Sequence, residues 1–93
     1  MICSYGGNDV IYASGGNDLI RAGAGKDTVY ANGGTDEVYA GGGNDVAYGN
    51  AGEDRLSGQR GDDVLYGGPH KDVLVGGAGL DRLFGLGGDV ERQ

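Results

Sequence analysis

The chain is short, rich in glycine and acidic. It has 93 residues, of which 23 are glycine, and its 7 basic and 14 acidic residues leave a net charge of −7. This balance argues against nucleic acid as a partner, because phosphates require a cationic surface, and it favours bound cations. No apolar run in the sequence approaches the roughly 18 residues that a membrane span needs.

A unit of nine residues repeats along the chain. The aspartates of this period are Asp9, Asp18, Asp27, Asp36, Asp45, Asp54, Asp63, Asp72 and Asp81. Two residues before the aspartate, except at His70, stand Gly7, Gly16, Gly25, Gly34, Gly43, Gly52, Gly61 and Gly79. Two residues after it stand Ile11, Ile20, Val29, Val38, Ala47, Leu56, Leu65, Leu74 and Leu83. A low-complexity tract would not hold three columns in phase, so the chain is a repeat protein.

Each unit divides into a turn and a very short strand. Its first six residues are turn formers that permit positive φ, and its last three read as a strand whose middle residue faces the core. In chain order the predicted strands are residues 10–12, 19–21, 28–30, 37–39, 46–48, 55–57, 64–66, 73–75 and 82–84. No segment shows helical spacing of apolar residues. The units should stack as a solenoid of parallel strands around a narrow core.

From residue 4 to about 89 these units resemble the RTX, or hemolysin-type, calcium-binding repeat G-G-x-G-x-D-x-U-x, in which U is a large aliphatic residue. Residues 76–84 fit every fixed position, whereas earlier units, such as Ala31–Asn32, depart at the first two. The resemblance implies an all-β fold, a parallel β-roll (right-handed β-solenoid) of tandem nonapeptide repeats with two repeats per coil. We expect one domain over residues 1–93, with repeats over about 4–84 and a degenerate last repeat over 85–93.

The resemblance also implies where calcium binds. Alternate units share an edge of the roll, so Asp9, Asp27, Asp45, Asp63 and Asp81 line one edge, and Asp18, Asp36, Asp54 and Asp72 line the other. Calcium would sit between stacked turns of one edge, which gives four sites and three sites, about seven ions in total. The aspartates of the period and the glycines two residues before them are the candidate metal residues.

The residue types suit this chemistry. Ca²⁺ takes six to eight oxygens from carboxylates and carbonyls, and glycine lets turn carbonyls converge on an ion. Zinc would need more than the single His and single Cys present, and Mg²⁺ demands a tighter octahedron. The alternative role of the aspartates is hydrogen bonding within their own turns.

Four places depart from the pattern. Because of Pro69 and His70, the two calcium sites that use the turn before Asp72 should be the poorest, with His70 a tolerated substitution and not a zinc ligand. In the last unit Asp89 comes one residue early and Arg92 stands where the aliphatic residue belongs, so the roll should end there. We expect Asp62 to be solvated. We expect Cys3 to lie in a frayed N-terminus.

The residue three after each aspartate points outward and is aromatic on one sheet: Tyr12, Tyr30, Tyr48, Tyr66 and Phe84. The other sheet has Arg21, Tyr39, Ser57 and Val75 at this position, which is a mixed set. One interpretation is cross-strand stacking that stabilises a thin sheet. The other is a contact surface for a second copy, a neighbouring domain or a ligand. The sequence leaves both open.

The expected function is calcium binding that folds and stabilises a secreted, extracellular protein of the type I secretion kind. Without metal we expect a largely disordered chain, because the core is thin and the stacked carboxylates repel. We expect no enzyme, since the chain has one His and no Ser-His-Asp set. The alternatives are a recognition or assembly surface on the aromatic face, or the C-terminal part of a secreted enzyme or toxin whose active domain lies elsewhere. Ice binding is weakly supported, because Asn precedes the repeat aspartate only at positions 8, 17 and 44.

Overall fold

Short strands and no helix make up the part of the chain that the structure describes. This computed structural model describes residues 2–69, 71–85 and 90–92. Its strands are β1 (Ile2–Cys3), β2 (Val10–Tyr12), β3 (Leu19–Arg21), β4 (Thr28–Tyr30), β5 (Glu37–Tyr39), β6 (Val46–Tyr48), β7 (Arg55–Ser57), β8 (Val64–Gly68), β9 (Val73–Val75), β10 (Arg82–Gly85) and β11 (Val90–Arg92). The predicted strands are confirmed, with β8 and β10 extended at their ends. His70 and Asp89, where we predicted irregular turns, lie outside the described residues.

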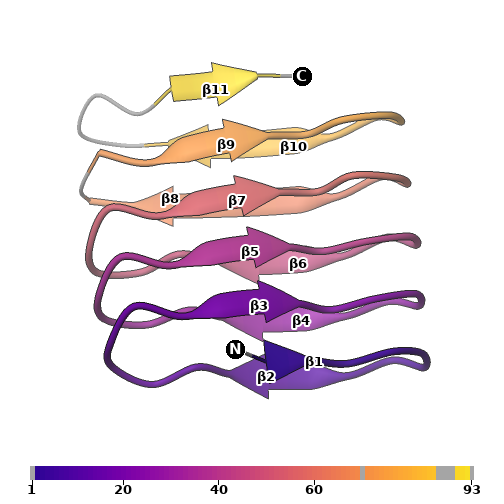
Figure 1. Cartoon of the computed structure of the whole chain (residues 1–93). Helices are drawn as coiled ribbons and strands as arrows, with labels where there is room; N and C mark the ends of the chain where they lie inside the picture. The colour runs from indigo at the N-terminus through magenta and orange to yellow at the C-terminus, as the bar shows by residue number, and fades with distance from the viewer. Residues whose placement is uncertain (1, 70, 86–89, 93) are drawn as a thin grey trace.

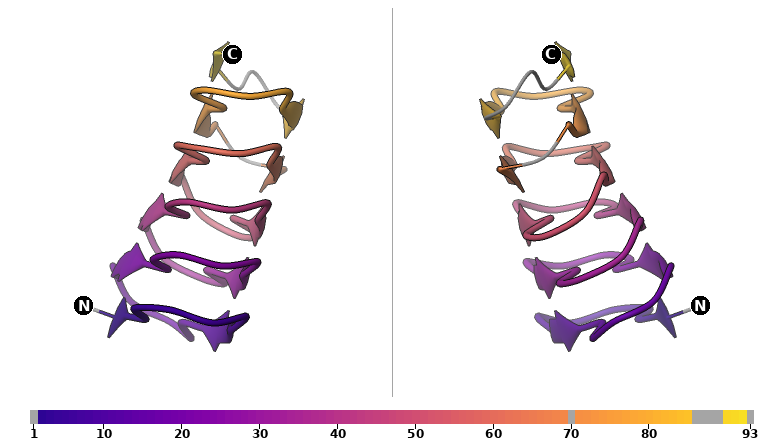
Figure 2. Two further views of the ribbon diagram at one scale, coloured as in Figure 1. Left: turned by 90° about the vertical axis from the view of Figure 1, so that its right-hand side faces the viewer. Right: turned by 90° about the vertical axis from the view of Figure 1, so that its left-hand side faces the viewer.

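The strands form two parallel sheets that face each other. One sheet has the order β1-β3-β5-β7-β9-β11 and the other the order β10-β8-β6-β4-β2. Figure 1 shows the chain rising as a right-handed coil, and Figure 2 shows the coils stacked, with the strands of one sheet along each side. Paired residues lie 18 positions apart, as in Val29↔Ala47 and Val38↔Leu56. Two repeats therefore make one coil, and the parallel β-roll predicted from the sequence is confirmed.

The inward column of aliphatic side chains forms the core. Its buried members are Ile11, Ile20, Val29, Val38, Ala47, Leu56, Leu65 and Leu74. A second column of small residues, including the fully buried Ala22, Ala31 and Ala40, closes the core toward the turns. The roll measures 31 × 27 × 13 Å, so only one layer of side chains fits between the sheets. A core this thin provides modest hydrophobic stabilisation for a chain so rich in glycine.

The first and last strands lie outside the regular units. β1 pairs with β3, and Cys3 is an exposed thiol within that strand. Our expectation of a frayed N-terminus at Cys3 was therefore wrong. At the other end β11 pairs with β9 through Val90↔Val73, a spacing of 17 (90 − 73) instead of 18. Our expectation that the roll ends at the last unit was therefore wrong, because β11 adds a further strand with a period shortened by one residue.

Candidate metal sites between stacked turns

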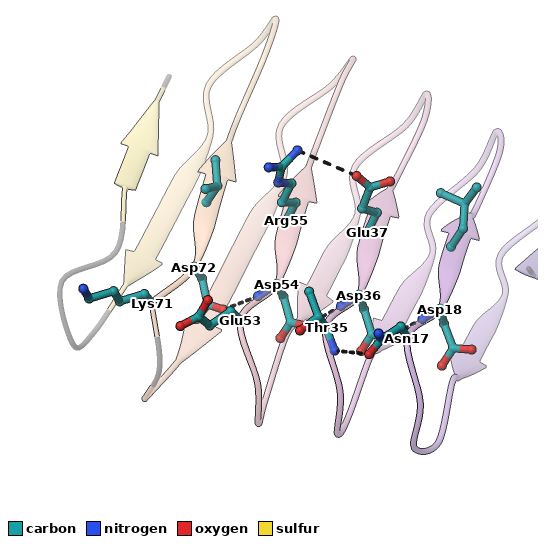
Figure 3. A pocket seen from close by; sticks show the side chains of 12 residues that line it. Asn17, Asp18, Thr35, Asp36, Glu37, Glu53, Asp54, Arg55, Lys71 and Asp72 are labelled. Atoms are coloured by element: carbon teal, nitrogen blue, oxygen red, sulfur yellow. Dashed lines mark hydrogen bonds and ion pairs between the residues drawn. The ribbon is translucent and has the colours of Figure 1, made fainter.

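The repeat aspartates stand at the start of the strands, in two rows along the edges of the roll. The turns before β2, β4, β6, β8 and β10 lie at the right of Figure 1, and the turns before β3, β5, β7 and β9 lie at the left. Figure 3 shows Asp18, Asp36, Asp54 and Asp72 side by side in a row along the second edge. They line an open groove of about 680 Å³. The predicted division of the aspartates between two edges is thus seen in the structure.

Each aspartate is bonded to the equivalent aspartate one coil away. The backbone N–H of the earlier residue donates to Oδ1 of the later one, at 2.6–2.9 Å. The bonded pairs are Asp9–Asp27, Asp27–Asp45, Asp45–Asp63 and Asp63–Asp81 on one edge, and Asp18–Asp36, Asp36–Asp54 and Asp54–Asp72 on the other. We call the space between two such turns a gap. These bonds use one oxygen of each carboxylate.

The second oxygen is left buried without a hydrogen-bond donor in most of these residues. Among the described residues this holds for Oδ2 of Asp18, Asp27, Asp36, Asp45, Asp54, Asp63 and Asp81. At the first turn the Ser4 hydroxyl donates to Oδ2 of Asp9 instead. A buried carboxylate oxygen without a partner is strongly destabilising unless a cation approaches it. The repetition of this arrangement along both edges fits a row of cation sites.

The ionisation of the buried aspartates is correspondingly perturbed. Burial raises the pKa of Asp45 and of Asp54 to about 7, and the pKa of Asp63 to about 6, against an ordinary 3.8. Burial also raises the pKa of Asp27 and of Asp36. In all five the neighbouring carboxylates add to the rise, and the backbone N–H bond opposes it. Burial and the neighbouring carboxylates therefore disfavour the ionised form of these side chains, and a positive charge nearby would favour it.

The glycines two residues before the aspartates bring carbonyl oxygens to the same gaps. Gly43 has a φ of +96°, and a Cβ built on it would lie 2.2 Å from the carbonyl oxygen of Gly25, one coil below. At Gly52 the corresponding distance, to the carbonyl oxygen of Gly34, is 1.9 Å. A side chain would therefore displace the carbonyl of the next turn. The column is glycine because stacked turns approach through their backbones there.

The donor set suits a hard cation. Among the described residues no three His, Cys, Asp or Glu side chains converge in a group that could hold a metal. Each gap instead offers a carboxylate and turn carbonyls. Oxygen donors of this kind match Ca²⁺, whereas zinc sites use nitrogen and sulfur.

Side chains directly before the aspartates also contribute, which the sequence did not predict. Asn8, Asn17 and Asn44 each accept a backbone N–H from one coil above. Asp62 is exposed, as we expected for a solvated residue, but its Oδ1 accepts the N–H of Leu80 at 2.8 Å. The recurrence of Asn before Asp was the available signal. Its meaning depends on the 18-residue coil, which brings the two turns together.

The aromatic residues of the β2–β10 sheet form a continuous stack. Successive ring centroids from Tyr12 to Phe84 lie 4.8–4.9 Å apart, with interplanar angles of 4–11°. The predicted cross-strand stacking is confirmed. Because each ring face inside the stack covers its neighbour, the rings present their edges outward. The second interpretation of this face, as a contact surface, stays a prediction.

These features define a class of protein: a parallel β-solenoid whose stacked turns offer carboxylate and carbonyl oxygens. A family model described as the RTX calcium-binding nonapeptide repeat (4 copies) matches residues 5–38, 39–69 and 66–89. The chain belongs to this family, whose repeats bind calcium and are typical of secreted proteins. No curated protein and no solved structure matches the chain. No helix in the described ranges has the length and apolar character to cross a membrane.

Proposed function

We propose that this chain is a calcium-dependent folding and stability module of a secreted protein, folding as one domain over residues 1–93. About seven ions occupy the gaps, held by the repeat aspartates and by the carbonyls of the glycine column. The observation that carries the proposal is the row of buried Oδ2 atoms without donors. A bound cation would satisfy these oxygens and offset the repulsion between neighbouring carboxylates.

The proposal links metal binding to folding. Bound calcium supplies positive charge inside each gap, and the aspartates and carbonyls of the chain position that charge between two turns. Without that charge, folding would bury several carboxyl groups whose pKa values are raised. A core only one layer of side chains thick would have to offset this cost. Metal binding then drives folding, as in other small metal-dependent domains. It can do so gap by gap, because each coil of a solenoid contacts only its neighbours.

The calcium affinity expected of such a module favours an extracellular setting. Extracellular calcium modules typically bind at about 10⁻⁴–10⁻³ M, well above the calcium level inside cells. A chain of this kind stays unfolded where calcium is scarce, which suits export, and folds outside the cell. We propose a binding role and no catalytic one, because the chain has a single His and no set of groups for nucleophilic catalysis.

A calcium titration tests the proposal. Circular dichroism should show strand signal appearing with calcium and disappearing on addition of chelator. Size-exclusion chromatography with light scattering, in both conditions, reports compaction and molar mass. Magnesium at the same concentration is the control for ionic strength and should produce much less strand signal. Strand content that chelation leaves unchanged would contradict the proposal.

A further inference from the structure

The turns of the roll are tied together at a second position, beside the aspartate rows. The Asn8 side chain accepts the N–H of Lys26 at 2.9 Å, and the Asn17 side chain accepts the N–H of Thr35 at 2.8 Å. Asn44 and Asp62 accept the N–H groups of Asp62 and Leu80, each at 2.8 Å. We call each of these bonds, from the residue before the aspartate to the turn one coil above, a clamp.

A clamp runs in the opposite direction to the aspartate bond next to it. Across the gap between Asp45 and Asp63, the lower turn donates through the N–H of Asp45 and the upper turn donates through the N–H of Asp62. The two turns are therefore bonded in both directions, through positions 44–45 of the lower turn and positions 62–63 of the upper turn. This arrangement fixes the separation of the two turns and their rotation about each other more firmly than one bond does.

The clamps divide the gaps into two kinds. Four gaps have both bonds: Asp9–Asp27, Asp18–Asp36, Asp45–Asp63 and Asp63–Asp81. Among the described residues, three gaps have the aspartate bond without a clamp: Asp27–Asp45, Asp36–Asp54 and Asp54–Asp72. In these three the clamp position holds Lys26, whose ammonium group has no acceptor, or Thr35 or Glu53, and among the described residues none of the three accepts such a bond. Between the turns of Asp36 and Asp54, the Asn50 side chain donates instead to Oδ1 of Asn32 at 3.3 Å, away from the clamp position. Figure 3 shows the clamp from Thr35 to Asn17 on the second edge.

We propose that Asn8, Asn17, Asn44 and Asp62 are positioning residues that preorganise four of the calcium gaps, so that these gaps bind calcium more tightly than the other three. The inference rests on the proposed function, namely that the gaps hold calcium. The physical reason is that an ion entering a gap must order both turns, and a turn already held in place loses less conformational freedom on binding.

The glycine column makes the clamp sterically feasible. A Cβ on Gly61 would lie 3.0 Å from Oδ1 of Asn44, and a Cβ on Gly79 would lie 2.9 Å from Oδ1 of Asp62. The clamping oxygen thus packs against the glycine of the turn above. At Gly43, above Lys26, the nearest atoms all belong to the Gly25 backbone. The clamping oxygen and the carbonyl oxygen of the turn below both lie against the glycine of the turn above. The positioning residues are therefore at the gap itself.

The test is a calcium titration of the full chain followed residue by residue by NMR. The backbone N–H of Asp45 lies in the gap that Asn44 clamps, and the N–H of Asp18 lies in a gap on the other edge. In Asn44→Ala the calcium concentration at which the Asp45 resonance reaches half its change should rise about fivefold, as for the loss of one ordinary hydrogen bond. The Asp18 midpoint should move much less.

Matched variants separate the clamp from charge and from general stability. Asn44→Asp keeps the acceptor, as Asp62 does naturally, and should restore tight binding. Lys26→Asn adds an acceptor for the N–H of Asn44, whereas Lys26→Ala removes the same charge without adding one. At the Asp27 amide, which reports the gap between Asp27 and Asp45, Lys26→Asn should bind about fivefold tighter than Lys26→Ala.

The outcomes are distinguishable. Equal midpoints at Asp45 in the wild type and in Asn44→Ala would overturn the positioning role. An equal rise at Asp45 and Asp18 would also overturn it, because it would show a general loss of stability. If the wild-type chain showed no calcium response at any residue, the proposed function would fail and this inference with it.

Discussion

The backbone N–H of Asp45 donates a 2.7 Å hydrogen bond to Oδ1 of Asp63, which lies one coil further along the roll. The other carboxylate oxygen of Asp63 is buried and has no hydrogen-bond donor. One oxygen therefore holds the two turns together, and the second is available to a cation. The two oxygens can be tested separately, because an amide keeps the first acceptor and loses the negative charge.

Asp63→Asn should weaken calcium binding and reduce the number of bound ions. Loss of a ligand should lower affinity at the affected site by at least about tenfold, since even outer-shell partners of metal ligands contribute roughly 10–100-fold. Calorimetry measures the affinity, and elemental analysis of the dialysed protein counts the ions. Asp62→Asn is the control, because it removes a neighbouring, exposed charge and keeps its acceptor. Equal losses in the two variants would contradict a ligand role for Asp63.

The metal-free roll should become more stable as the solution is acidified. The pKa of Asp45 and of Asp54 is about 7 in the folded chain against 3.8 ordinarily. Between these values the folded state binds more protons than the unfolded state, so stability falls as pH rises from about 4 to about 7. Protons and calcium compete for the same carboxylates, so calcium affinity should rise over this range.

Circular dichroism in calcium-free buffer, between about pH 5 and pH 7.5, measures this dependence. Light scattering must accompany it, because the sequence pI of about 4.3 favours precipitation at lower pH. Asp54→Asn should flatten the dependence, since it removes one of the carboxyl groups with a raised pKa. Strand content that increases with pH in the absence of calcium would contradict the prediction.

The sequence predicted the regular part of the roll because the nine-residue period carries it. The strands, the inward aliphatic column and the two rows of aspartates all follow from that period. β1 could not be predicted in this way, because Ile2 and Cys3 precede the first unit and become a strand by pairing with β3. β11 was missed for a related reason, since its pairing with β9 has a period shortened by one residue.

The sequence predicted less of the turn geometry. The left-handed glycines before the aspartates were predicted, but a second left-handed position was not. Ser14, Asn32, Asn50 and Gln59 occupy it, with φ between +61° and +68°. Non-glycine residues seldom adopt this conformation, and single-residue preferences do not reveal it. The clamps were missed because Asn44 and Asp62 become partners only when an 18-residue coil stacks their turns.

Gly43→Ala should destabilise the roll, and Gly42→Ala should not. The added Cβ at Gly43 would lie 2.2 Å from the Gly25 carbonyl oxygen, at a φ of +96°. At Gly42 it would meet nothing within 4 Å. We expect Gly43→Ala to lose more than about 1 kcal/mol of unfolding free energy in calcium. Gly42→Ala should be neutral or stabilise by up to about 1 kcal/mol. Urea unfolding measures both, and similar values would show that the turns do not stack through their backbones.

Replacing Tyr30, Tyr48 and Tyr66 by Ser distinguishes the two interpretations of the aromatic face. The rings stack face to face at 4.8–4.9 Å, and the triple variant removes every one of these contacts. Aromatic pairs contribute about 0.5–1.5 kcal/mol each beyond their buried area, so we expect a loss of several kcal/mol in urea unfolding with calcium present. Tyr5→Ser is the control, because Tyr5 is 85% exposed and lies outside the stack.

Light scattering on the same samples gives the molar mass. A mass that is the same in wild type and variant assigns the stack to stability alone, because its rings already satisfy one another. A calcium-dependent oligomer that forms in the wild type and is lost in the triple variant would instead identify this face as a contact surface between copies.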